Sequence, residues 1–293
     1  MNNKWGEVES LKIYTLLDDY AGYESQFWAT HGVSFLLEVK FQGITKRILS
    51  DVGPDERVIL HNMEIFGISP ESIDIITLSH AHYDHTKGLL GFLKEAKKEI
   101  PIVAHPLLFR KNFINRPYFR EIGIGLKNSK EEIEKYGGIL ILTREPMNLV
   151  EGVIISGEVE RITDFEARGI GTYNLNEEGY LEKDRLLDDF SVAVNIKDKG
   201  IVIITGCAHS GIVNISKHFK KLFDSDNIIG IIGGLHLVSS TKEQIEKTVE
   251  GLKKFPLKWL YPGHCTGFPA QVALYNAFPK KYGILHSGLV VKE

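Results

Sequence analysis

Four side chains that commonly bind metals fall within six residues near the middle of the first half of the chain. The stretch is Ser79-His80-Ala81-His82-Tyr83-Asp84-His85, and it directly follows a mostly apolar run at 73–78. Imidazole nitrogen and carboxylate oxygen are zinc ligands, and a catalytic zinc site keeps one coordination position open. A strand that ends in a tight turn can direct such side chains into one small volume. The spacing therefore predicts a metal site.

Three further predicted strands end in a turn that combines glycine or proline with histidine. The turns are Gly206-Cys207-Ala208-His209, Gly233-Gly234-Leu235-His236 and Pro262-Gly263-His264-Cys265. Open sheets place their sites at the carboxyl ends of their strands. We therefore expect the four strand ends to converge on one site.

Composition limits the kinds of partner that the protein can have. The chain has 293 residues, a net charge of −3 and two cysteines, Cys207 and Cys265. This charge gives no long-range attraction to nucleic acid or to an acidic membrane, and no apolar run is long enough to span a bilayer. We expect a small-molecule substrate, no nucleic-acid partner and no membrane partner, and a homodimer remains possible. The N-terminus lacks the apolar core of a signal peptide, and each cysteine sits beside a histidine in a turn, so we expect a cytoplasmic protein with free thiols.

Periodicity predicts an α/β chain that is interrupted in its middle. We expect one domain, 1–293, with an inserted α+β subdomain at about 106–189, where aromatic and basic residues mix. Predicted strands lie at 11–17, 33–41, 46–49, 101–104, 139–142, 191–196, 201–205, 228–232 and 257–261. Predicted helices lie at 61–66, 89–98, 130–136, 212–223 and 242–254.

The ligand pattern resembles the metallo-β-lactamase superfamily. The resemblance rests on the cluster at 80–85, on Asp51-Val52-Gly53 upstream and on His264 downstream. It implies a four-layer αβ/βα sandwich with a two-metal site at one edge between the sheets. It also implies two divalent ions, with Zn²⁺ expected and Mn²⁺ or Fe²⁺ as alternatives. One ion would take His80 and His82, and the other would take Asp84, His85 and His264. Asp51 would orient the ligand loop from behind.

Two positions depart from the superfamily pattern. The metal-bridging aspartate expected after the strand at 201–205 is replaced by Cys207, and the third histidine expected before that strand is missing. The acidic residues nearest to the missing histidine are Asp184, Asp188 and Asp189. His209 could act as a ligand in its place, and Cys207 is either a ligand or a small apolar filler.

The departures themselves resemble one branch of the superfamily. They are the segment 205–214, the Gly233-Gly234-Leu235-His236-Leu237 stretch and the His264-Cys265-Thr266-Gly267 turn. Members of this branch are described as metal-dependent hydrolases or as the dihydropteroate-synthase-like enzyme of methanopterin biosynthesis. The first interpretation is a hydrolase whose metals activate water toward a small, phosphorylated or pterin-like substrate. The alternative is a synthase that joins a pterin methyl carbon to the amine of ribofuranosyl-aminobenzene 5′-phosphate. A third interpretation is a non-catalytic, metal-dependent binding protein.

The remaining candidates would act on the substrate. His209, His236 and Asp84 are the candidate acid–base groups, with a turn histidine as the alternative role for His236. His31 is a candidate at the rim of the site. Ser210 opens the helix predicted at 212–223, whose free N–H groups favour anions, and Arg168 could add a bidentate contact to a phosphate. An ordinary helix cap with solvated arginines is the simpler alternative for that pair.

Overall fold

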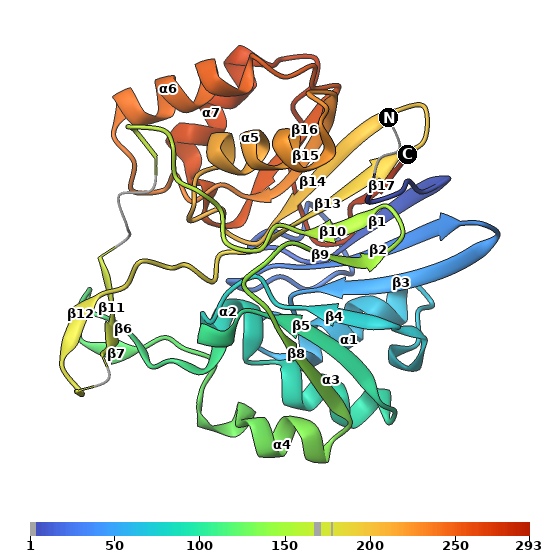
Figure 1. Ribbon diagram of the computed structural model, residues 1–293, viewed down its shortest axis with the longest axis vertical. Helices are drawn as coiled ribbons and strands as arrows, with labels where there is room; N and C mark the ends of the chain where they lie inside the picture. The colour runs from blue at the N-terminus through green and yellow to red at the C-terminus, as the bar shows by residue number, and fades with distance from the viewer. Residues whose placement is uncertain (1–3, 167–170, 177) are drawn as a thin grey trace.

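The computed structural model describes residues 4–166, 171–176 and 178–293. Over these ranges the strands form three sheets, two of which face each other at the centre of the molecule (Figure 1). None of the helices in the described ranges is long and apolar enough to cross a membrane.

The first sheet is built mainly from the N-terminal half. Its strands, in spatial order, are β17 (Val290–Lys292), β1 (Ser10–Leu17), β2 (Ser34–Phe41), β3 (Ile44–Ser50), β4 (Ile75–Thr77), β5 (Ile100–Ala104) and β8 (Gly138–Leu142). The hairpin of β2 and β3 turns at Gln42-Gly43, where both residues have positive φ, as a tight reversal requires. From β3 to β8 the neighbouring strands run parallel.

The second sheet is built mainly from the C-terminal half. Its strands, in spatial order, are β16 (Trp259–Gly263), β15 (Ile228–Gly234), β14 (Gly200–Thr205), β13 (Ser191–Ile196), β10 (Val153–Ile155) and β9 (Met147–Val150). The pairs β14–β15 and β15–β16 are parallel, whereas β13 and β14 form an antiparallel hairpin.

Helices cover the outer face of each sheet, which gives four layers. The first sheet carries α1 (Glu56–Ile65), α3 (Leu89–Ala96) and α4 (Lys130–Lys135), and the second carries α5 (Ile212–Phe223), α6 (Lys242–Leu252) and α7 (Phe268–Ala277) (Figure 1). Side chains alternate across each strand. Leu11 and Ile13 therefore pack between the sheets, while Leu16 packs under the helices of its own sheet. The expected αβ/βα sandwich is the observed fold.

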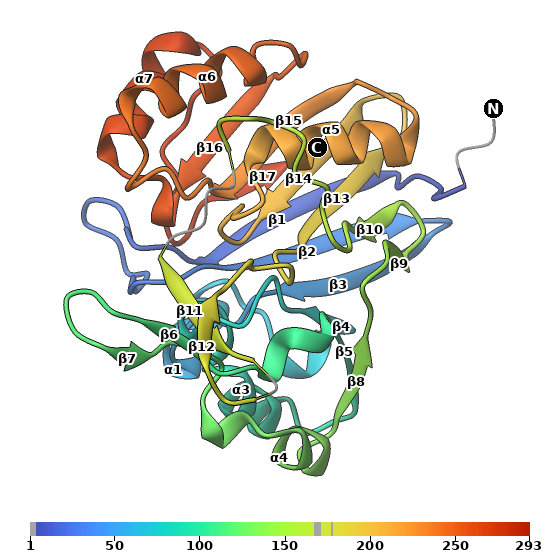
Figure 2. The same ribbon diagram turned by 60° about the vertical axis from the view of Figure 1, so that its left-hand side comes forward.

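The third sheet is smaller and projects beside the body of the molecule, as both ribbon views show (Figures 1 and 2). It consists of β12 (Leu181–Lys183), β11 (Thr172–Leu175), β6 (Asn112–Ile114) and β7 (Arg120–Glu121). The expected insert at 106–189 is therefore too wide, because β8, β9 and β10 inside that range belong to the two main sheets. Strands β8, β9 and β10 lie in a part of the sequence that is rich in polar and aromatic residues, and the sequence pattern did not predict that they pair with distant strands.

Some elements of the main sheets and of their helices match the predicted ranges closely, and others were not predicted. Helix α5 and strand β13 have the predicted bounds, and α6 begins at the predicted residue, where Thr241 forms a capping box with Gln244. Strands β9 and β10 and helix α7 were not predicted. Helix α7 shows little separation of apolar and polar faces in its sequence, which is the signal that such a prediction needs.

Parallel pairing brings the functional loops together. Ser50, the last residue of β3, pairs with Thr77, the last residue of β4, so the chain leaves both strands at the same edge. In the other sheet Gly234 of β15 pairs with Gly263 of β16, and Thr205 of β14 pairs with Gly233. The loops after these five strands carry the candidate ligands, as the sequence led us to expect.

We predict that Phe219→Ala destabilises the fold by about 3–5 kcal/mol, because removing a large core side chain leaves a cavity. Phe219 is fully buried on α5, where it packs against the second sheet. Urea unfolding would measure the loss, and Lys221→Ala, an exposed change on the same helix, serves as the control. A loss below 1 kcal/mol would contradict this packing.

Candidate metal centre

The candidate ligands meet between the carboxyl ends of the two main sheets. His80, His82, Asp84 and His85 lie on the loop after β4 and on the single turn α2 (Tyr83–Thr86). Cys207 and His209 follow β14, His236 follows β15, and His264 begins the 3₁₀ turn after β16. All of them except His236, which is half-buried, are nearly inaccessible to solvent.

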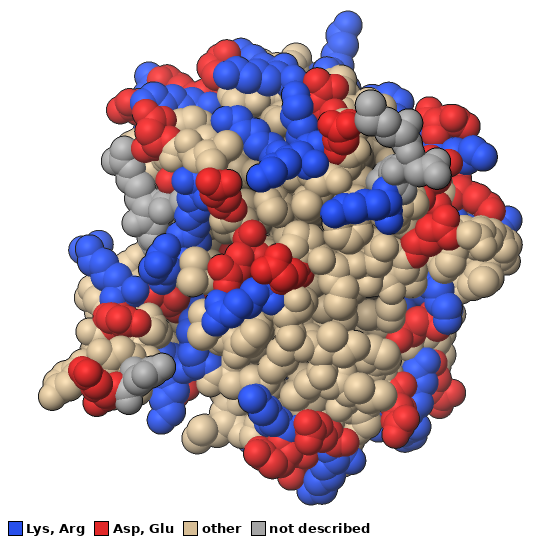
Figure 3. All heavy atoms as spheres, viewed as in Figure 1, with Lys and Arg blue, Asp and Glu red and all other residues tan. Residues whose placement is uncertain are grey.

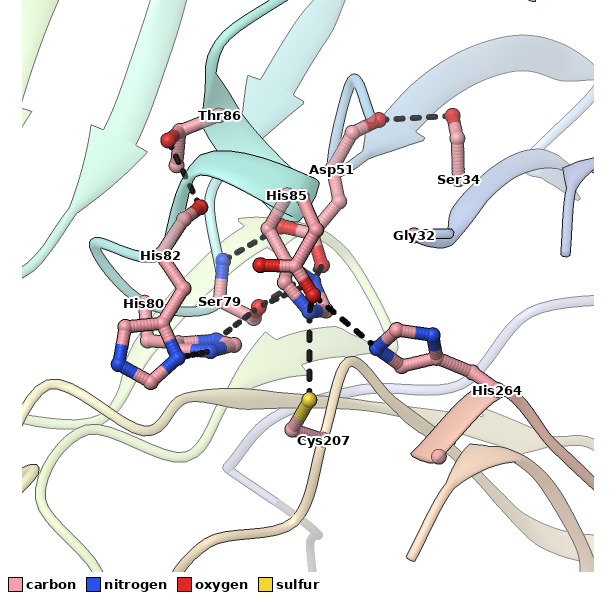
Figure 4. Close-up of polar contacts among 12 residues, drawn as sticks. Gly32, Ser34, Asp51, Ser79, His80, His82, His85, Thr86, Cys207 and His264 are labelled. Atoms are coloured by element: carbon pink, nitrogen blue, oxygen red, sulfur yellow. Dashed lines mark hydrogen bonds and ion pairs between the residues drawn. The ribbon is translucent and has the colours of Figure 1, made fainter. Parts of the chain in front are cut away.

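Four groups of ligand atoms in the described part of the chain are compact enough to hold a metal ion, and two of them consist only of residues predicted as metal ligands. One consists of His80, Cys207 and His209, and the other of His85, Cys207 and His264; within each group the atoms lie within 4.8 Å of one another. Cys207 belongs to both groups, and its Sγ lies 3.2 Å from Nε2 of His85 (Figure 4). The thiol therefore lies where the superfamily pattern would place a bridging aspartate.

The remaining predicted ligands border these groups. Nε2 of His80 lies 3.0 Å from Nδ1 of His82 and 3.2 Å from Nε2 of His209. Oδ2 of Asp84 lies 3.4 Å from Nε2 of His264 and 3.5 Å from Nε2 of His85. The seven residues predicted as metal ligands thus form one continuous cluster.

Hydrogen bonds to carboxylates fix the tautomers of two histidines. Oδ2 of Asp51 accepts from Nδ1 of His85 at 2.7 Å, and Oδ1 of Asp19 accepts from Nδ1 of His264 at 2.7 Å. An ionised carboxylate only accepts hydrogen bonds, so each Nδ1 carries a proton, and each Nε2 has a free lone pair when the ring is neutral, as it must be to bind a metal. Both lone pairs face the cluster. This is how supporting carboxylates orient metal-binding histidines.

Ser79 fixes the tautomer of His80 in the same way. Its backbone N–H and its hydroxyl donate to the two oxygens of Asp51, both at 2.7 Å (Figure 4). The hydroxyl oxygen then accepts from Nδ1 of His80 at 2.9 Å, which leaves Nε2 of His80 unprotonated. Asp51, predicted to orient the ligand loop, therefore contacts the loop at three points.

The residues fit a divalent metal ion. The buried atoms His82 Nε2, His209 Nδ1 and His264 Nε2 have no hydrogen-bond partner. Buried polar atoms without partners are rare in folded proteins because each loses its hydration without compensation. Nitrogen, oxygen and sulfur donors converge here, and this donor set suits zinc. A bound cation would satisfy the Nε2 of His264, which belongs to the group with His85 and Cys207.

Electrostatics in the cluster separate the neutral from the charged histidines. Burial lowers the pKa of His80 and of His209, which keeps both imidazoles neutral and able to bind a metal. Burial acts in the same direction on His85, but the carboxylates of Asp84 and Asp51 outweigh it and raise the pKa of His85 to about 9. The part of the cluster near Asp84 therefore favours positive charge.

Four site residues other than glycine adopt left-handed backbone conformations. The φ angles are 60° at Asp51, 58° at Ala208, 45° at His236 and 45° at His264. Such conformations cost about 1–3 kcal/mol each and persist where the surrounding structure imposes them. Strain gathered in the loops that carry the ligands indicates a functional site.

His31, predicted at the rim, borders the site. Nε2 of His31 lies 3.4 Å from Oδ2 of Asp84, and Nδ1 lies 3.0 Å from Oδ2 of Asp19. The next residue is Gly32, where a Cβ atom would come within 2.3 Å of the carbonyl oxygen of Asp84. Glycine thus lets this loop approach the ligand turn, and His31 stays more than half exposed.

The three aspartates near the missing histidine have structural roles. Asp188 accepts from the backbone N–H of Ala81 at 2.8 Å and pairs with Arg110, which also pairs with Asp184 at 3.0 Å. Asp189 accepts from the backbone N–H of Ser210 at 2.7 Å. Asp188 and Asp189 thus hold the ligand loops in place from opposite sides. His209 is the residue that completes a group with His80 and Cys207.

The anion site predicted at the start of α5 is filled by the chain itself. The carboxylate of Glu166 accepts from the backbone N–H groups of Val213 and Asn214, both at 2.9 Å. Gly211 permits this contact, because a Cβ atom there would meet the Glu166 side chain at 2.5 Å. With the N–H of Ser210 bound to Asp189, a phosphate would have to displace a carboxylate. Arg168, the other predicted contact, lies outside the described residues.

A cavity opens beside the cluster on the side of His209 and His236. Its volume is about 320 Å³, and both histidines line it together with Glu166, residues 239–241 at the start of α6, and Gln244. The rings of His209 and His236 lie 4.3 Å apart. A cavity of this size suits a small ligand.

Sequence reasoning missed several residues of the site. Asp19 and Ser79 orient ligands, Glu166 lines the cavity, and the Sγ of Cys265 lies 3.3 Å from that of Cys207. Cys265 next to His264 was a visible signal. Asp19 and Glu166 carry no motif, because only the folded chain brings them to the centre.

The geometry and the comparisons with known proteins agree on the class of protein. Residues 46–122 match the family model of the beta-lactamase superfamily domain. A solved structure described as a metal-dependent hydrolase of the beta-lactamase superfamily is 25% identical, with a TM-score of 0.79 over 96% of this chain and 98% of that one. The chain belongs to the metallo-β-lactamase superfamily, and it is an enzyme.

Two curated relatives match over nearly the whole chain. One is the 7,8-dihydropterin-6-methyl-4-(beta-D-ribofuranosyl)-aminobenzene-5'-phosphate synthase of Methanocaldococcus jannaschii, 43% identical over 290 residues, covering 98% of both chains. The other is an uncharacterized protein of the same organism, 33% identical over 279 residues, covering 94% of this chain and 98% of the relative. The branch expected from the turns after β14, β15 and β16 is therefore the one that these relatives represent.

We predict that Asp19→Asn weakens metal binding about 10- to 100-fold, because the amide no longer holds the His264 tautomer as firmly. Competition with a chromophoric zinc chelator would measure the affinity. Asp226→Asn, an exposed change far along the chain, is the matched control. Equal zinc affinities for the two variants would show that Asp19 does not support the metal centre.

Proposed function

We propose that this enzyme is a synthase that joins a 7,8-dihydropterin to 4-(β-D-ribofuranosyl)aminobenzene 5′-phosphate. The single observation that carries the proposal is the 43% identity over 98% of both chains to the synthase with this product. This level of similarity extends beyond the superfamily, whose members share a fold and a metal-binding pattern. It reverses the order of the first two of our three interpretations from sequence, in which a hydrolase came first.

The reaction consists of one substitution at carbon. The aromatic amine nitrogen forms a bond to the methyl carbon of the pterin, and the bond from that carbon to an oxygen leaving group breaks with its electron pair. A phosphorylated hydroxymethyl group supplies such a leaving group. The nitrogen then loses a proton, and an arylammonium ion is acidic enough to give it to water. A dedicated base is therefore not required, and we assign His209 to metal binding in place of acid–base catalysis.

Two divalent metal ions are the cofactors in this proposal, with zinc as the expected metal. The group of His80, Cys207 and His209 would hold one ion, and the group of His85, Cys207 and His264, beside Asp84, would hold the other. Bound ions of this kind stabilise negative charge on a departing oxygen. Asp51 and Asp19, through their hydrogen bonds to His85 and His264, would leave the Nε2 atoms of these histidines free to bind the ions.

The cavity beside His209 and His236 would receive one half of the substrate pair. Its volume of about 320 Å³ suits one ring system with its substituent. Hydroxyl groups of residues 239–241 can donate and accept hydrogen bonds, as a polar heterocycle requires. Charged side chains of both signs are interspersed on the face shown in Figure 3, with basic side chains (Lys or Arg) over the upper helical layer. A small-molecule substrate remains our proposal for the partner.

The proposal is tested with pure protein, both substrates and mass spectrometry. We expect the coupled product with zinc-loaded protein and none after exhaustive treatment with a chelator. A parallel reaction without the amine reports hydrolysis of the pterin ester. Metal-dependent hydrolysis without any coupled product would favour the hydrolase. If neither coupling nor hydrolysis occurs, the proposal that the enzyme acts on this class of substrate is refuted.

His209→Ala should lose metal and most of its coupling activity, because His209 replaces the missing third histidine of the superfamily pattern. Elemental analysis of the purified protein measures the metal, and product formation measures the activity. His61→Ala is the control, since His61 lies at the surface and stacks on Trp28. Full metal content and activity in the His209 variant would overturn its assignment.

Ser240→Phe should fill part of the cavity and raise KM at least about 10-fold, while metal content stays unchanged. Ser240 lines the cavity at the start of α6 and touches none of the metal groups. Steady-state kinetics with each substrate varied in turn would show which half the cavity holds. Unchanged KM for both substrates would place the binding site elsewhere.

A further inference from the structure

Cys265 lies against the metal centre, yet neither group assigned above uses it. Its Sγ lies 3.3 Å from Sγ of Cys207, and both thiols are buried and free. Cys207, His236 and Cys265 form another compact group, in which one potential ligand atom from each lies within 4.8 Å of the others. Cysteine and histidine in this combination form a known type of zinc site.

The distance between the sulfurs favours a shared metal. Two thiolates on one tetrahedral zinc ion, each about 2.3 Å from it, lie about 3.8 Å apart. A disulfide would require about 2.05 Å. The separation of 3.3 Å is closer to the spacing of two ligands of one ion than to a covalent bond.

The backbone is arranged to make room for this group. A Cβ atom on Gly234 would come within 2.7 Å of Sγ of Cys265, so only glycine leaves space for the thiol. The Gly234 N–H donates to the carbonyl of Gly206 at 3.1 Å, and the Leu235 N–H donates to the hydroxyl of Thr266 at 3.2 Å. These bonds connect the three loops that carry Cys207, His236 and Cys265. The group is therefore held in place independently of any ion.

His236 supplies the third donor and the connection to the cavity. Its backbone is held at φ 45°, and its buried Nδ1 has no hydrogen-bond partner. The same side chain lines the cavity beside His209. Three protein ligands next to a cavity leave a fourth position for water or substrate, as in catalytic zinc sites.

We propose that Cys207, His236 and Cys265 form a sulfur-rich metal position that binds a thiophilic divalent cation and faces the cavity. This inference rests on the proposed metal centre, with which it shares Cys207. A thiolate can bridge two ions, so with this position filled Cys207 would link it to one of the two histidine-bound ions, and the other ion would be held by its histidines without the thiolate. His236 is then a metal ligand, and the acid–base role that its sequence context predicted for it falls away.

Cobalt substitution tests the proposal, because thiolate-to-cobalt charge transfer gives near-ultraviolet absorption in proportion to the number of bound sulfurs. We expect Cys265→Ser to reduce this absorption to about half of the wild-type value, since one of two thiolates is lost. We expect His236→Ala to retain the absorption at saturating Co²⁺ and to weaken Cd²⁺ binding at least about 10-fold. His61→Ala is the control.

Unchanged absorption and Cd²⁺ affinity in Cys265→Ser would overturn the proposal and leave Cys265 as a buried thiol. If Cys265→Ser fails to fold, the Cd²⁺ affinity of His236→Ala is the test: the weakening given above supports the proposal, and an unchanged affinity overturns it. Neither readout uses the coupling reaction, so the synthase proposal can fail while the sulfur-rich position stands. Coupled product from a protein whose thiolate absorption does not depend on Cys265 would leave the synthase proposal standing without the sulfur-rich position.

Discussion

The hydrogen bonds of Asp51 are the constraint on which the rest of the centre depends. Its buried carboxylate accepts from the Ser79 N–H, the Ser79 hydroxyl and Nδ1 of His85, all at 2.7 Å. Its own backbone is tied to Thr77 and Ser34. Because a Cβ atom on Gly206 would meet both Ser79 and Asp51, the first sheet's ligand loop packs directly on the end of β14. One carboxylate thus orients ligands and joins the two halves.

Cys207 is the counterpart of Asp51 in the second sheet. It lies at the end of β14, and every compact group that includes His80, His85 or Cys265 also includes its sulfur. A thiolate in the place of a bridging aspartate is a softer donor, and soft donors favour zinc over manganese or magnesium. The loops after β14, β15 and β16 therefore define how this branch differs from hydrolases with a carboxylate bridge.

The cavity lies on the same side as these rebuilt loops. His209 and His236 separate it from the cluster, and Glu166 blocks the anion site that the helix α5 would otherwise offer. A substrate that enters here meets the neutral imidazole of His209, the ring of His236 and several hydroxyl groups. This arrangement suits a polar heterocycle better than a phosphate, in line with the proposal that the cavity receives one ring system of the substrate pair.

The sequence by itself predicted the α/β strands and the ligand-rich strand ends, and its resemblance to the superfamily added the sandwich fold and the replacement of the bridging aspartate by Cys207. These features are local: apolar runs predict strands, and short spacings such as that of His80, His82 and His85 act through adjacent backbone. Tertiary structure alone decided the rest. Asp19 reaches His264 across 245 positions, Glu166 reaches the start of α5 across 47, and β8 to β10 join main sheets from inside the expected insert. Contacts between residues so far apart depend on how the sheets pack, and no local pattern in the sequence encodes them.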